Sequence, residues 1–273
     1  MTSDRFQELA KAHHSISQTR IVLTGARSAF IGPSLVKEPY RTAVTSIIVG
    51  LDRDITLSWI ENSEDPARPS PLAVIPPDTV CELDTDGDIA ILFTDVLKDD
   101  CSEIDLRLVE SNIDQLRELL RQGPGDRAPE AYLQDVFSEL GVVSEMSARQ
   151  EIARVVAALG RTPEEFATVE RAAELAGLST MRFQHVFTET VGVPFRRYRQ
   201  WRRMGRVIRA LAKGDNLTEA AYLAGFSNSA HLSTAFKAMF GLRPSTLLAN
   251  PVEYFLSDAE FGDDVEISRA DPY

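Results

Sequence analysis

The chain has 273 residues, of which 44% are hydrophobic and 26% are charged, a composition typical of globular proteins. No segment approaches the roughly 20 apolar residues that span a bilayer, and the N-terminus lacks the apolar region of a signal peptide, so we expect a cytoplasmic protein without a membrane partner. Cys81 and Cys101 are too few for a disulfide framework and lack metal-ligand spacing, which fits a reducing compartment. The length favours more than one domain.

The net charge of −12 is distributed unevenly along the chain. Residues 1–150 carry a net charge of −12, residues 151–250 carry +6, and residues 251–273 carry −6. An acidic protein is a poor general ligand for DNA, because Lys and Arg supply most of the affinity for phosphates. A basic segment between two acidic ones indicates a localised site for a polyanion.

The first hundred residues have the pattern of short strands. Segments rich in Val, Ile, Leu and Thr alternate with turn-forming clusters of Asp, Pro and Gly. These segments are 20–24, 42–49, 55–60, 72–75 and 88–94. Strands at this spacing predict a small β-sandwich or barrel, which we assign to residues 1–100.

Helical periodicity begins after Cys101. Apolar residues recur at spacings of three and four over 104–120, 129–140 and 147–159, which predicts connector helices within 101–160. Residues 161–250 have a helical pattern throughout, with short Gly-containing turns, and residues 251–273 have the composition of a loosely held acidic tail. The chain is therefore predicted to have an α+β fold.

A near-duplication lies within the basic segment. The sequence Leu-Ala-Gly-Leu-Ser at 175–179 recurs as Leu-Ala-Gly-Phe-Ser at 223–227, an offset of 48. Gly-Val-Pro at 192–194 is answered by Gly-Leu-Arg-Pro at 241–244, where one extra residue in the second copy makes the offset 49. Each copy predicts a helix, a tight turn and a second helix.

The residues of each copy suit a helix-turn-helix motif. Small alanines on the opening helix permit close approach of its partner, and Gly177 can adopt the positive φ of a tight turn. Ser179 is placed to cap the next helix. This is the arrangement in which a second helix is presented to the major groove of DNA.

Residues 194–213 predict one long helix between the two copies. An apolar stripe at helical spacing runs along it, and arginines occupy much of the remaining surface. Twenty helical residues extend about 30 Å, close to the roughly 34 Å of one DNA turn. Such a connector would hold two reading helices near successive major grooves, and Arg202 is a candidate for phosphate contact.

At these residues the chain resembles the DNA-binding domain of the AraC/XylS family over 168–248. The shared features are the two Leu-Ala-Gly-x-Ser turns, the arginine-rich linker, Ala-Phe-Lys before Phe-Gly, and the closing Gly-Leu-Arg-Pro-Ser. The resemblance implies that the second helix of each motif enters the major groove. It implies a first reader of Met181, Arg182, Gln184 and His185, a second of Ser229, Ala230, His231 and Thr234, and phosphate contacts from Lys237 and Arg243.

The second reader departs from the family pattern, in which a long polar side chain often stands at the position of Thr234. Ala230 adds no hydrogen-bonding group, and Met181 in the first reader can contact a thymine methyl but cannot hydrogen-bond a base edge. We therefore expect modest recognition by each subunit and a homodimer on double-stranded promoter DNA. RNA polymerase would be a further partner if the protein activates transcription.

The N-terminal segment weakly resembles the cupin-like sensor barrel that precedes the reader in this family, chiefly over 72–77 and 91–95. Enzymatic cupins hold a metal with clustered histidines, whereas the histidines here, His13, His14, His185 and His231, all lie outside 20–97, the part of the N-terminal domain that resembles the barrel. We therefore expect no metal site, no catalytic residues, no cofactor and no enzymatic activity. The barrel would bind a small-molecule effector or support dimerisation.

Three other hypotheses remain open from the sequence. Arg199 and Arg203 have the four-residue spacing of sites that clamp cyclic dinucleotides, so this helix is a candidate effector clamp. A cupin-type enzyme with an incidental helical appendage is a second alternative. A regulator that acts mainly through protein contacts, with a degenerate DNA reader, is a third.

Overall fold

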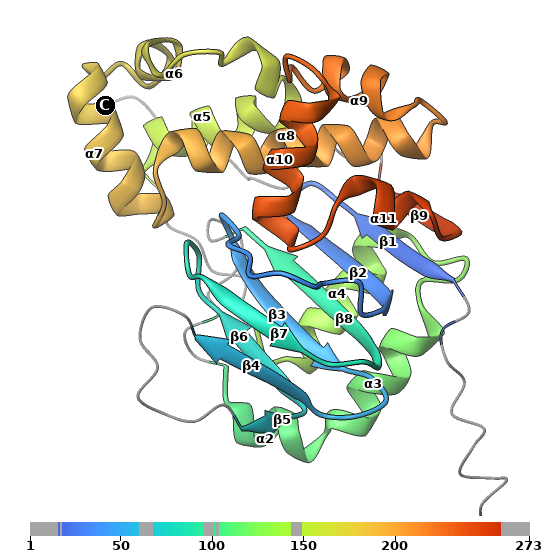
Figure 1. Cartoon of the computed structure of the whole chain (residues 1–273). Coiled ribbons are helices and arrows are strands. Elements are labelled where there is room, and N and C mark those ends of the chain that lie inside the picture. Colours follow the sequence, from blue (N-terminus) through green and yellow to red (C-terminus); the bar gives the residue numbers. More distant parts are fainter. Residues whose placement is uncertain are drawn as a thin grey trace, which may run out of the picture.

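The computed structural model describes residues 16, 18–59, 68–95, 101, 104–142 and 149–257. Strands β1 to β8 come first along the chain, followed by helices α2 to α11 and a last strand, β9. The strands form the lower half of the molecule in Figure 1, and the helices of the second half of the chain lie above them. This arrangement confirms the predicted α+β class.

Two sheets face each other in the N-terminal half. The larger has the strand order β6-β3-β8-β2-β1-β9, and the smaller has the order β5-β4-β7. Ile48 and Ile91 of the larger sheet share an apolar core with Ile55 and Leu83 of the smaller. The strands are Thr19–Leu23 (β1), Arg27–Pro33 (β2), Thr45–Gly50 (β3), Ile55–Trp59 (β4), Pro69–Ser70 (β5), Leu72–Ile75 (β6), Cys81–Asp84 (β7), Asp88–Thr94 (β8) and Val252–Leu256 (β9).

The described strands do not close into a barrel. Ladder pairing stops at β6 and β9 in the larger sheet and at β5 and β7 in the smaller. The two sheets are held together by side chains packed between them, because no ladder joins the edge strands named here. The predicted barrel is therefore an open pair of sheets, the alternative that the strand spacing also allowed.

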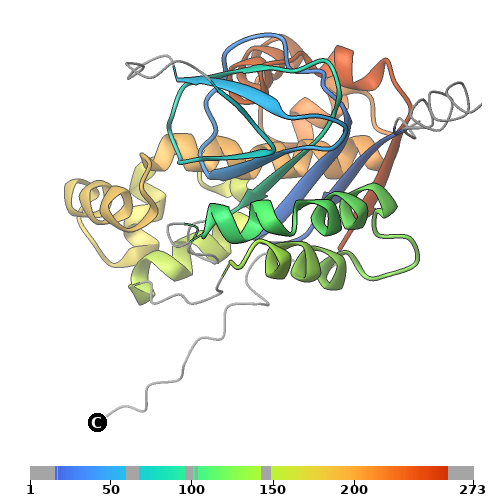
Figure 2. The ribbon, with the colours of Figure 1, turned by 90° about the horizontal axis from the view of Figure 1, so that it is seen from below.

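The central strand β8 is buried on both of its faces. Ile89, Ile91 and Phe93 enter the core between the sheets, whereas Ala90 and Leu92 enter a second core under helices. Successive side chains of a strand point to opposite faces, so a continuous apolar run supplies both cores. Helices α3 and α4 lie across this outer face of the sheet (Figure 2). The helices of this layer are Leu106–Ser111 (α2), Ile113–Gln122 (α3) and Pro129–Glu139 (α4).

Two helix-turn-helix motifs flank the long helix α8 (Phe195–Ala212). Phe183, Phe187 and Tyr198 pack in the core of the first motif, and Met204 and Phe236 pack in the core of the second. At about 1.5 Å per residue, the 18 residues of α8 extend about 27 Å. The other elements are Gln150–Arg161 (α5), the short 3-10 turn Pro163–Glu165 (η1), Val169–Ala176 (α6), Thr180–Val191 (α7), Leu217–Leu223 (α9), Ser229–Phe240 (α10) and Pro244–Leu248 (α11).

Strand β9 returns the chain from the helical half to the sheet. It pairs in parallel with β1 over five residues. Phe255 packs against the core under α2, α3 and α4, whereas Tyr254 packs against the core of the second motif. The sequence analysis assigned residues 251–273 to a loosely held tail, and the first part of that segment is this strand. Residues 258–273 lie outside the described part of the chain.

Removal of β9 is expected to destabilise the protein. Truncation after Asn250 should lower the melting temperature by roughly 5–15 °C, because half-buried apolar side chains contribute about 2–4 kcal/mol and each kcal/mol shifts the melting temperature by about 2–4 °C. Truncation after Ser257 leaves β9 intact and serves as the control. Calorimetry of the two chains checks this expectation, and equal melting temperatures would contradict it.

Candidate nucleic-acid interface

The turns of the two motifs have the geometry that their residues predict. Gly177 has a φ of 70° and Gly225 a φ of 74°, in the left-handed region that glycine adopts without strain. The Ser179 Oγ accepts a hydrogen bond from the backbone N–H of Arg182 at 3.4 Å, as expected for the cap of α7. In the second motif the cap of α10 is Asn228, whose Oδ1 accepts from the backbone N–H at the third helical position at 2.8 Å.

Small side chains form the buried face of the opening helix in each motif. All of these alanines are buried, as the sequence predicts. Because alanine adds one methyl group beyond the backbone, the reading helix can pack closely against its partner. These residues are Ala172, Ala173 and Ala176 on α6, with Ala220 and Ala221 on α9 and Ala224 directly after it.

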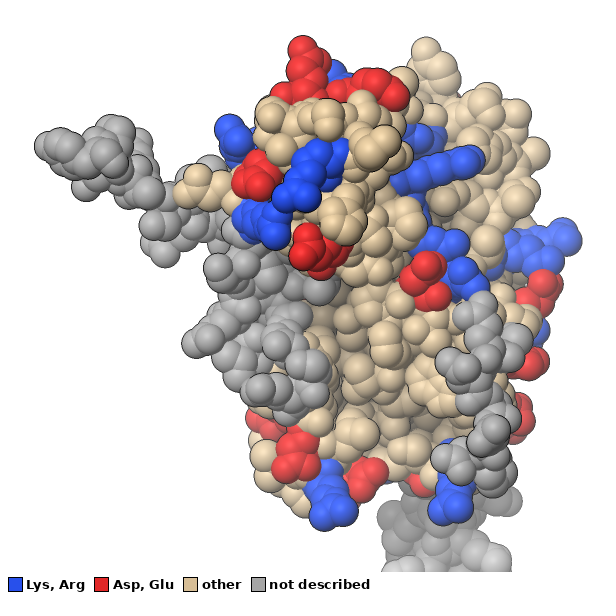
Figure 3. Space-filling view, turned by 90° about the vertical axis from the view of Figure 1, so that its left-hand side faces the viewer, with Lys and Arg blue, Asp and Glu red and all other residues tan. Residues whose placement is uncertain are grey.

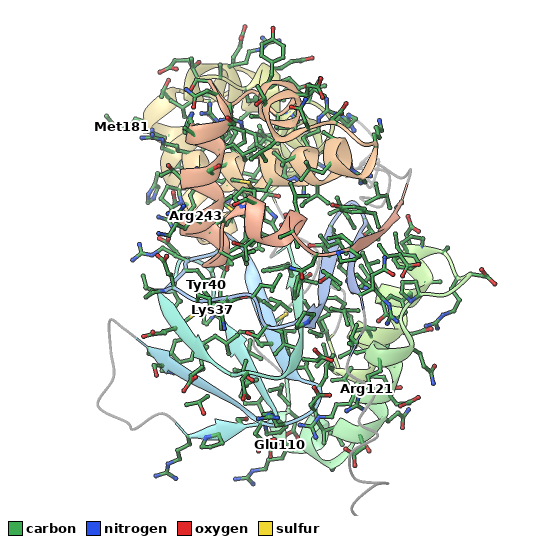
Figure 4. All side chains as sticks on the ribbon, turned by 45° about the vertical axis from the view of Figure 1, so that its right-hand side comes forward. Lys37, Tyr40, Glu110, Arg121, Met181 and Arg243 are labelled. Carbon is green, nitrogen blue, oxygen red and sulfur yellow. The ribbon has the colours of Figure 1, made fainter. Side chains whose placement is uncertain are left out.

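The first reading helix, α7, presents its predicted contact residues to solvent. Met181, Arg182, Gln184 and His185 are all exposed, and Met181 is 83% exposed. An exposed methionine of this extent gains nothing from the protein core, so its place on the surface is consistent with a contact to another molecule. Met181 lies at the outer edge of the helical half (Figure 4).

The second reading helix, α10, offers fewer polar groups. Ala230, His231 and Thr234 are exposed and Ser229 is half-buried. The Thr234 hydroxyl donates a hydrogen bond to the Ala230 carbonyl of its own helix at 3.0 Å. His231 is therefore the exposed residue of this predicted set with a side-chain nitrogen to offer a base edge.

Lys237 and Arg243, the predicted phosphate contacts, differ in their surroundings. Arg243 is exposed, and Figure 4 shows it above Lys37 and Tyr40 of the N-terminal half. Lys237 is half-buried, and its Nζ lies 2.7 Å from Oε2 of Glu38. In this arrangement the predicted phosphate contact Lys237 is paired with a carboxylate of the N-terminal half.

The segment that carries Glu38 is fixed to the end of α10. The backbone N–H of Lys37 donates to the Gly241 carbonyl and that of Arg41 to the Ala238 carbonyl, both at 3.1 Å. Gly241 has a φ of 68°, and an added Cβ would lie 2.4 Å from the Glu38 carbonyl oxygen. Glycine is thus required at this position for both its conformation and its close contact.

A second ion pair joins the two halves. The guanidinium of Arg197, in the first turn of α8, lies 2.7 Å from the carboxylate of Asp78, which is also 3.7 Å from Arg41. Lys and Arg side chains gather over the helical half on the face that Figure 3 shows, with acidic side chains around them. Part of the cationic surface is thus already paired within the protein.

Two arginines of the linker helix, Arg202 and Arg209, are hydrogen-bonded within the protein. Arg202 was expected to contact phosphate, but it donates to the Gly25 carbonyl at 3.1 Å and lines a cavity between α8 and the sheet. The reason is that α8 packs between the motifs and the N-terminal half, so much of its polar surface is covered by other parts of this chain. Arg209, on the same helix, likewise donates to the Ser257 carbonyl at 2.8 Å.

The predicted Arg199–Arg203 clamp is also engaged within the protein. Arg199 donates to the carbonyls of Phe166 and Ala167, where η1 leads into α6. Arg203 is buried, donates to the Ala224 carbonyl at 2.6 Å and lies 3.8 Å from the ring centre of Phe226. Burial, and then the charge of Arg199, lowers the pKa of Arg203 to about 10. Both guanidinium groups of the predicted clamp are thus hydrogen-bonded to backbone carbonyls of the two motifs or of the segment that leads into them.

A buried contact that the sequence analysis missed connects α8 to the larger sheet. The Tyr198 hydroxyl donates to the carboxylate of Asp95, and both residues are buried. Burial, and then the Asp95 charge, raises the pKa of Tyr198 well above its usual value, so the hydroxyl keeps its proton. The isolated Asp95 after a predicted strand gave no sign of this partner, which lies 103 residues away in the sequence.

A protein-family model described as a helix-turn-helix domain matches residues 172–250. These residues are a helix-turn-helix domain of the AraC type. The chain is a DNA-binding transcription regulator, as the duplicated motif predicted.

Solved structures of ToxT from Vibrio cholerae have a similar fold. An apo variant from strain SCE256 is 15% identical, with a TM-score of 0.55, and the match covers 83% of this chain and 98% of that chain. The unsaturated fatty acid-bound wild-type protein from the same strain is 13% identical, with a TM-score of 0.51, over 82% and 95% of the two chains. At these identities the likeness of the regulator to ToxT concerns the fold.

The described residues of the regulator offer neither a metal site nor a membrane-spanning helix. No group of three or more His, Cys, Asp or Glu side chains among them is placed to hold a metal ion. None of the described helices is long and apolar enough to cross a bilayer. His13 and His14 lie outside the described residues.

Substitutions at the two classes of predicted DNA contact are expected to differ in their effect. Arg182→Ala should relax base preference at one position of the binding site, at a cost of about 1–3 kcal/mol, because an arginine can bind guanine through two hydrogen bonds. Arg243→Ala should weaken binding to all sequences and reduce the salt dependence by about one unit of slope. Selection from a random duplex library measures the base preference, and titrations across salt concentrations measure the salt dependence. The same base preferences and the same salt dependence in the two variants would contradict the assignment of Arg182 to a base and Arg243 to a phosphate.

Removal of the Glu38 carboxylate is expected to strengthen DNA binding. Glu38→Gln frees Lys237 for phosphate, so affinity for a random duplex at low salt should rise about 2–5-fold, as expected from a partly exposed ion pair. The slope of log affinity against log salt should become steeper by about 0.9. Fluorescence anisotropy between about 50 and about 200 mM salt measures both quantities.

Asp86→Asn is the matched control, since it removes the same charge from an ion pair with Arg53 within the N-terminal half. Asp86→Asn should reproduce any general effect of net charge on DNA affinity, but it should not make the slope of log affinity against log salt steeper. An equal response in the two variants would argue against the pairing, as would an undiminished effect of Glu38→Gln in a Lys237→Gln background.

Proposed function

We propose that the regulator binds promoter DNA through its two reading helices and responds to an amphipathic carboxylate held between its two halves. The observation that carries this proposal is a cavity of about 340 Å³ whose walls come from both halves of the molecule. Residues of β1, β2, β8 and the end of β9 line it from the sheet, and residues of α8 and α10 line it from the helical half. Cavities of about 300–1,000 Å³ are typical of small-molecule sites.

The cavity combines apolar walls with cations. Phe30 and Phe93 of the sheet and Trp201 and Phe240 of the helical half are among its apolar residues. The cationic side chains that line it are Arg202, Arg206, Arg209 and Lys213, whereas the guanidinium of Arg27, also among the lining residues, contacts Gln134 and Phe137 of α4. An anionic head group would gain charge-assisted hydrogen bonds from such side chains, while an aliphatic chain would be removed from water by the aromatic ones. This chemistry favours a fatty acid or a similar carboxylate over a sugar or a metal ion.

The fold comparison supports the same class of ligand. One of the ToxT structures of similar fold has an unsaturated fatty acid bound. The N-terminal half, which the sequence analysis assigned to an effector or to dimerisation, supplies a large part of the cavity wall here. An occupant that contacts both halves would favour one relative arrangement of sheet and α8 over others, which is how a ligand shifts the population of a regulator.

The proposal includes the partners expected from the sequence. Each subunit offers few base-reading groups, so a homodimer on double-stranded promoter DNA would supply the specificity that one copy lacks. RNA polymerase is a partner if the protein activates. We propose that this protein is a regulator without catalytic activity or a resident cofactor.

A larger side chain placed in the cavity tests whether the cavity is the effector-binding site. Gly205 lies in the middle of α8 and lines the cavity, and a Cβ added there would meet no atom within 4 Å. Gly205→Leu should therefore fold normally, with a gain in helix propensity of up to about 1 kcal/mol, while its side chain occupies space needed by a ligand. We expect oleate to bind the wild-type protein and to bind Gly205→Leu at least about tenfold more weakly, a loss of about 1.4 kcal/mol, by calorimetric titration.

Gly205→Ala is the control, because it also removes the glycine but adds a single methyl group. It should bind oleate nearly as well as the wild type. Equal oleate binding by Gly205→Leu and the wild type, or no binding by the wild type, would reject the cavity as the effector site. Oleate should also change the affinity of the wild-type protein for its promoter DNA, and this response should be lost in Gly205→Leu.

A further inference from the structure

The turn of the second motif contains one residue more than the turn of the first. Ser179 follows Gly177 by two positions and caps α7, whereas Gly225 is followed by Phe226, Ser227 and then the cap, Asn228. Ser227, which matches Ser179 in the sequence, is exposed and is not needed for the cap, because Asn228 supplies the cap with its own side chain. Its role must therefore lie elsewhere.

Ser227 contacts a residue of the second reading helix. Its Oγ lies 3.0 Å from Nδ1 of His231, one turn further along the chain. His231 is at the third position of α10, directly exposed on the side expected to face DNA. With Nδ1 engaged by Ser227, the ring has Nε2 left for a partner outside the protein.

The His231 ring is also held from the side of the core. It meets the buried ring of Phe226 edge-on, with centroids 5.4 Å apart and planes at 82°. Phe226 is in turn covered by the Arg203 guanidinium, 3.8 Å from its centre, which the Ala224 carbonyl fixes in place. The imidazole thus has a supported plane as well as a hydrogen-bonded edge, unlike a side chain free to rotate on a helix surface.

We propose that Ser227 positions His231 so that its Nε2–H donates to a guanine of the DNA site. When the Ser227 hydroxyl donates to Nδ1, the neutral imidazole carries its proton on Nε2. In the protonated imidazole Nδ1–H would donate to the Ser227 oxygen instead, and Nε2 carries a proton as well. In the major groove such a donor meets acceptors, and guanine presents two adjacent ones, N7 and O6. This inference rests on the proposed DNA-reading function and adds a specificity-determining pair to it.

The proposal makes the two motifs chemically different. The residue at the third position of α7 is Arg182, which can donate through a fork of two N–H groups, whereas the third position of α10 carries a single fixed N–H. Both favour guanine, but the arginine does so through its own geometry and the histidine through its neighbours. The preference from the second motif should therefore depend on Ser227, and that from the first should not.

Selection from a random duplex library with the full chain tests this dependence. The wild type should enrich a site with a guanine preference at a position that His231→Ala abolishes. Ser227→Ala should reduce that guanine preference about 3–10-fold, the effect of losing one orienting hydrogen bond. The base preference at the position that depends on Arg182, identified by its loss in Arg182→Ala, should not change in Ser227→Ala. Ser227→Thr, which keeps the hydroxyl, should restore it.

Nitrogen NMR of histidine-labelled protein gives a second measurement. The chain has four histidines, and the resonances of His231 are identified by their absence from the spectrum of His231→Ala. They should show the Nε2–H tautomer of His231 in the wild type and a mixture of tautomers in Ser227→Ala. An unchanged site preference in Ser227→Ala, or an even loss at all positions, would overturn the positioning role while leaving DNA reading intact. If the wild type enriches no site, the DNA-reading function itself fails, and this proposal with it.

Discussion

The burial of α8 is the constraint on which the rest of the structure depends. One part of its apolar stripe, including Phe195 and Tyr198, lies in the core of the first motif, and a later part, including Met204 and Val207, lies in the core of the second. The same helix reaches the larger sheet through the Tyr198–Asp95 hydrogen bond. Because packed interiors transmit displacement instead of absorbing it, a shift of α8 moves both reading helices relative to the sheet. The spacing of the readers and their link to the N-terminal half thus have one structural cause.

The helix-turn-helix motifs could be predicted from sequence because their determinants are local. A glycine able to adopt positive φ, a capping side chain and a row of alanines all act within a few residues of one another, and the near-duplication presents them twice. The exposure of Arg182 and His185 follows from the same periodicity. The strand segments were also visible, since β8 has the continuous apolar run of a strand buried on two faces.

Contacts between distant segments could not be predicted in this way. Strand β9 pairs with β1 across more than two hundred residues, and no local pattern in 252–256 names that partner. The charge of an arginine likewise does not tell whether it meets a phosphate or a carbonyl oxygen. Arg202, Arg203 and Arg209 all meet carbonyls because α8 is enclosed by the chain itself, and that enclosure depends on the tertiary fold. The extra residue of the second motif was visible as a change of offset, but the contact of Ser227 to His231 required the turn geometry.

The uneven charge of the chain acquires a physical meaning from the contact between its halves. The acidic N-terminal half places Glu38 and Asp78 against Lys237 and Arg197 of the basic half, so each carboxylate neutralises a cation of the domain that contains the reading helices. Carboxylates near a DNA surface also repel phosphates directly, over a range of about 8 Å at physiological salt. The separation of the two halves therefore sets how much positive charge the readers present. Under the proposed function, an occupant of the cavity would act on this separation, because residues of both halves line its walls. The overall charge of −12 is then compatible with DNA binding, since the acidic residues act on affinity through their position instead of their number.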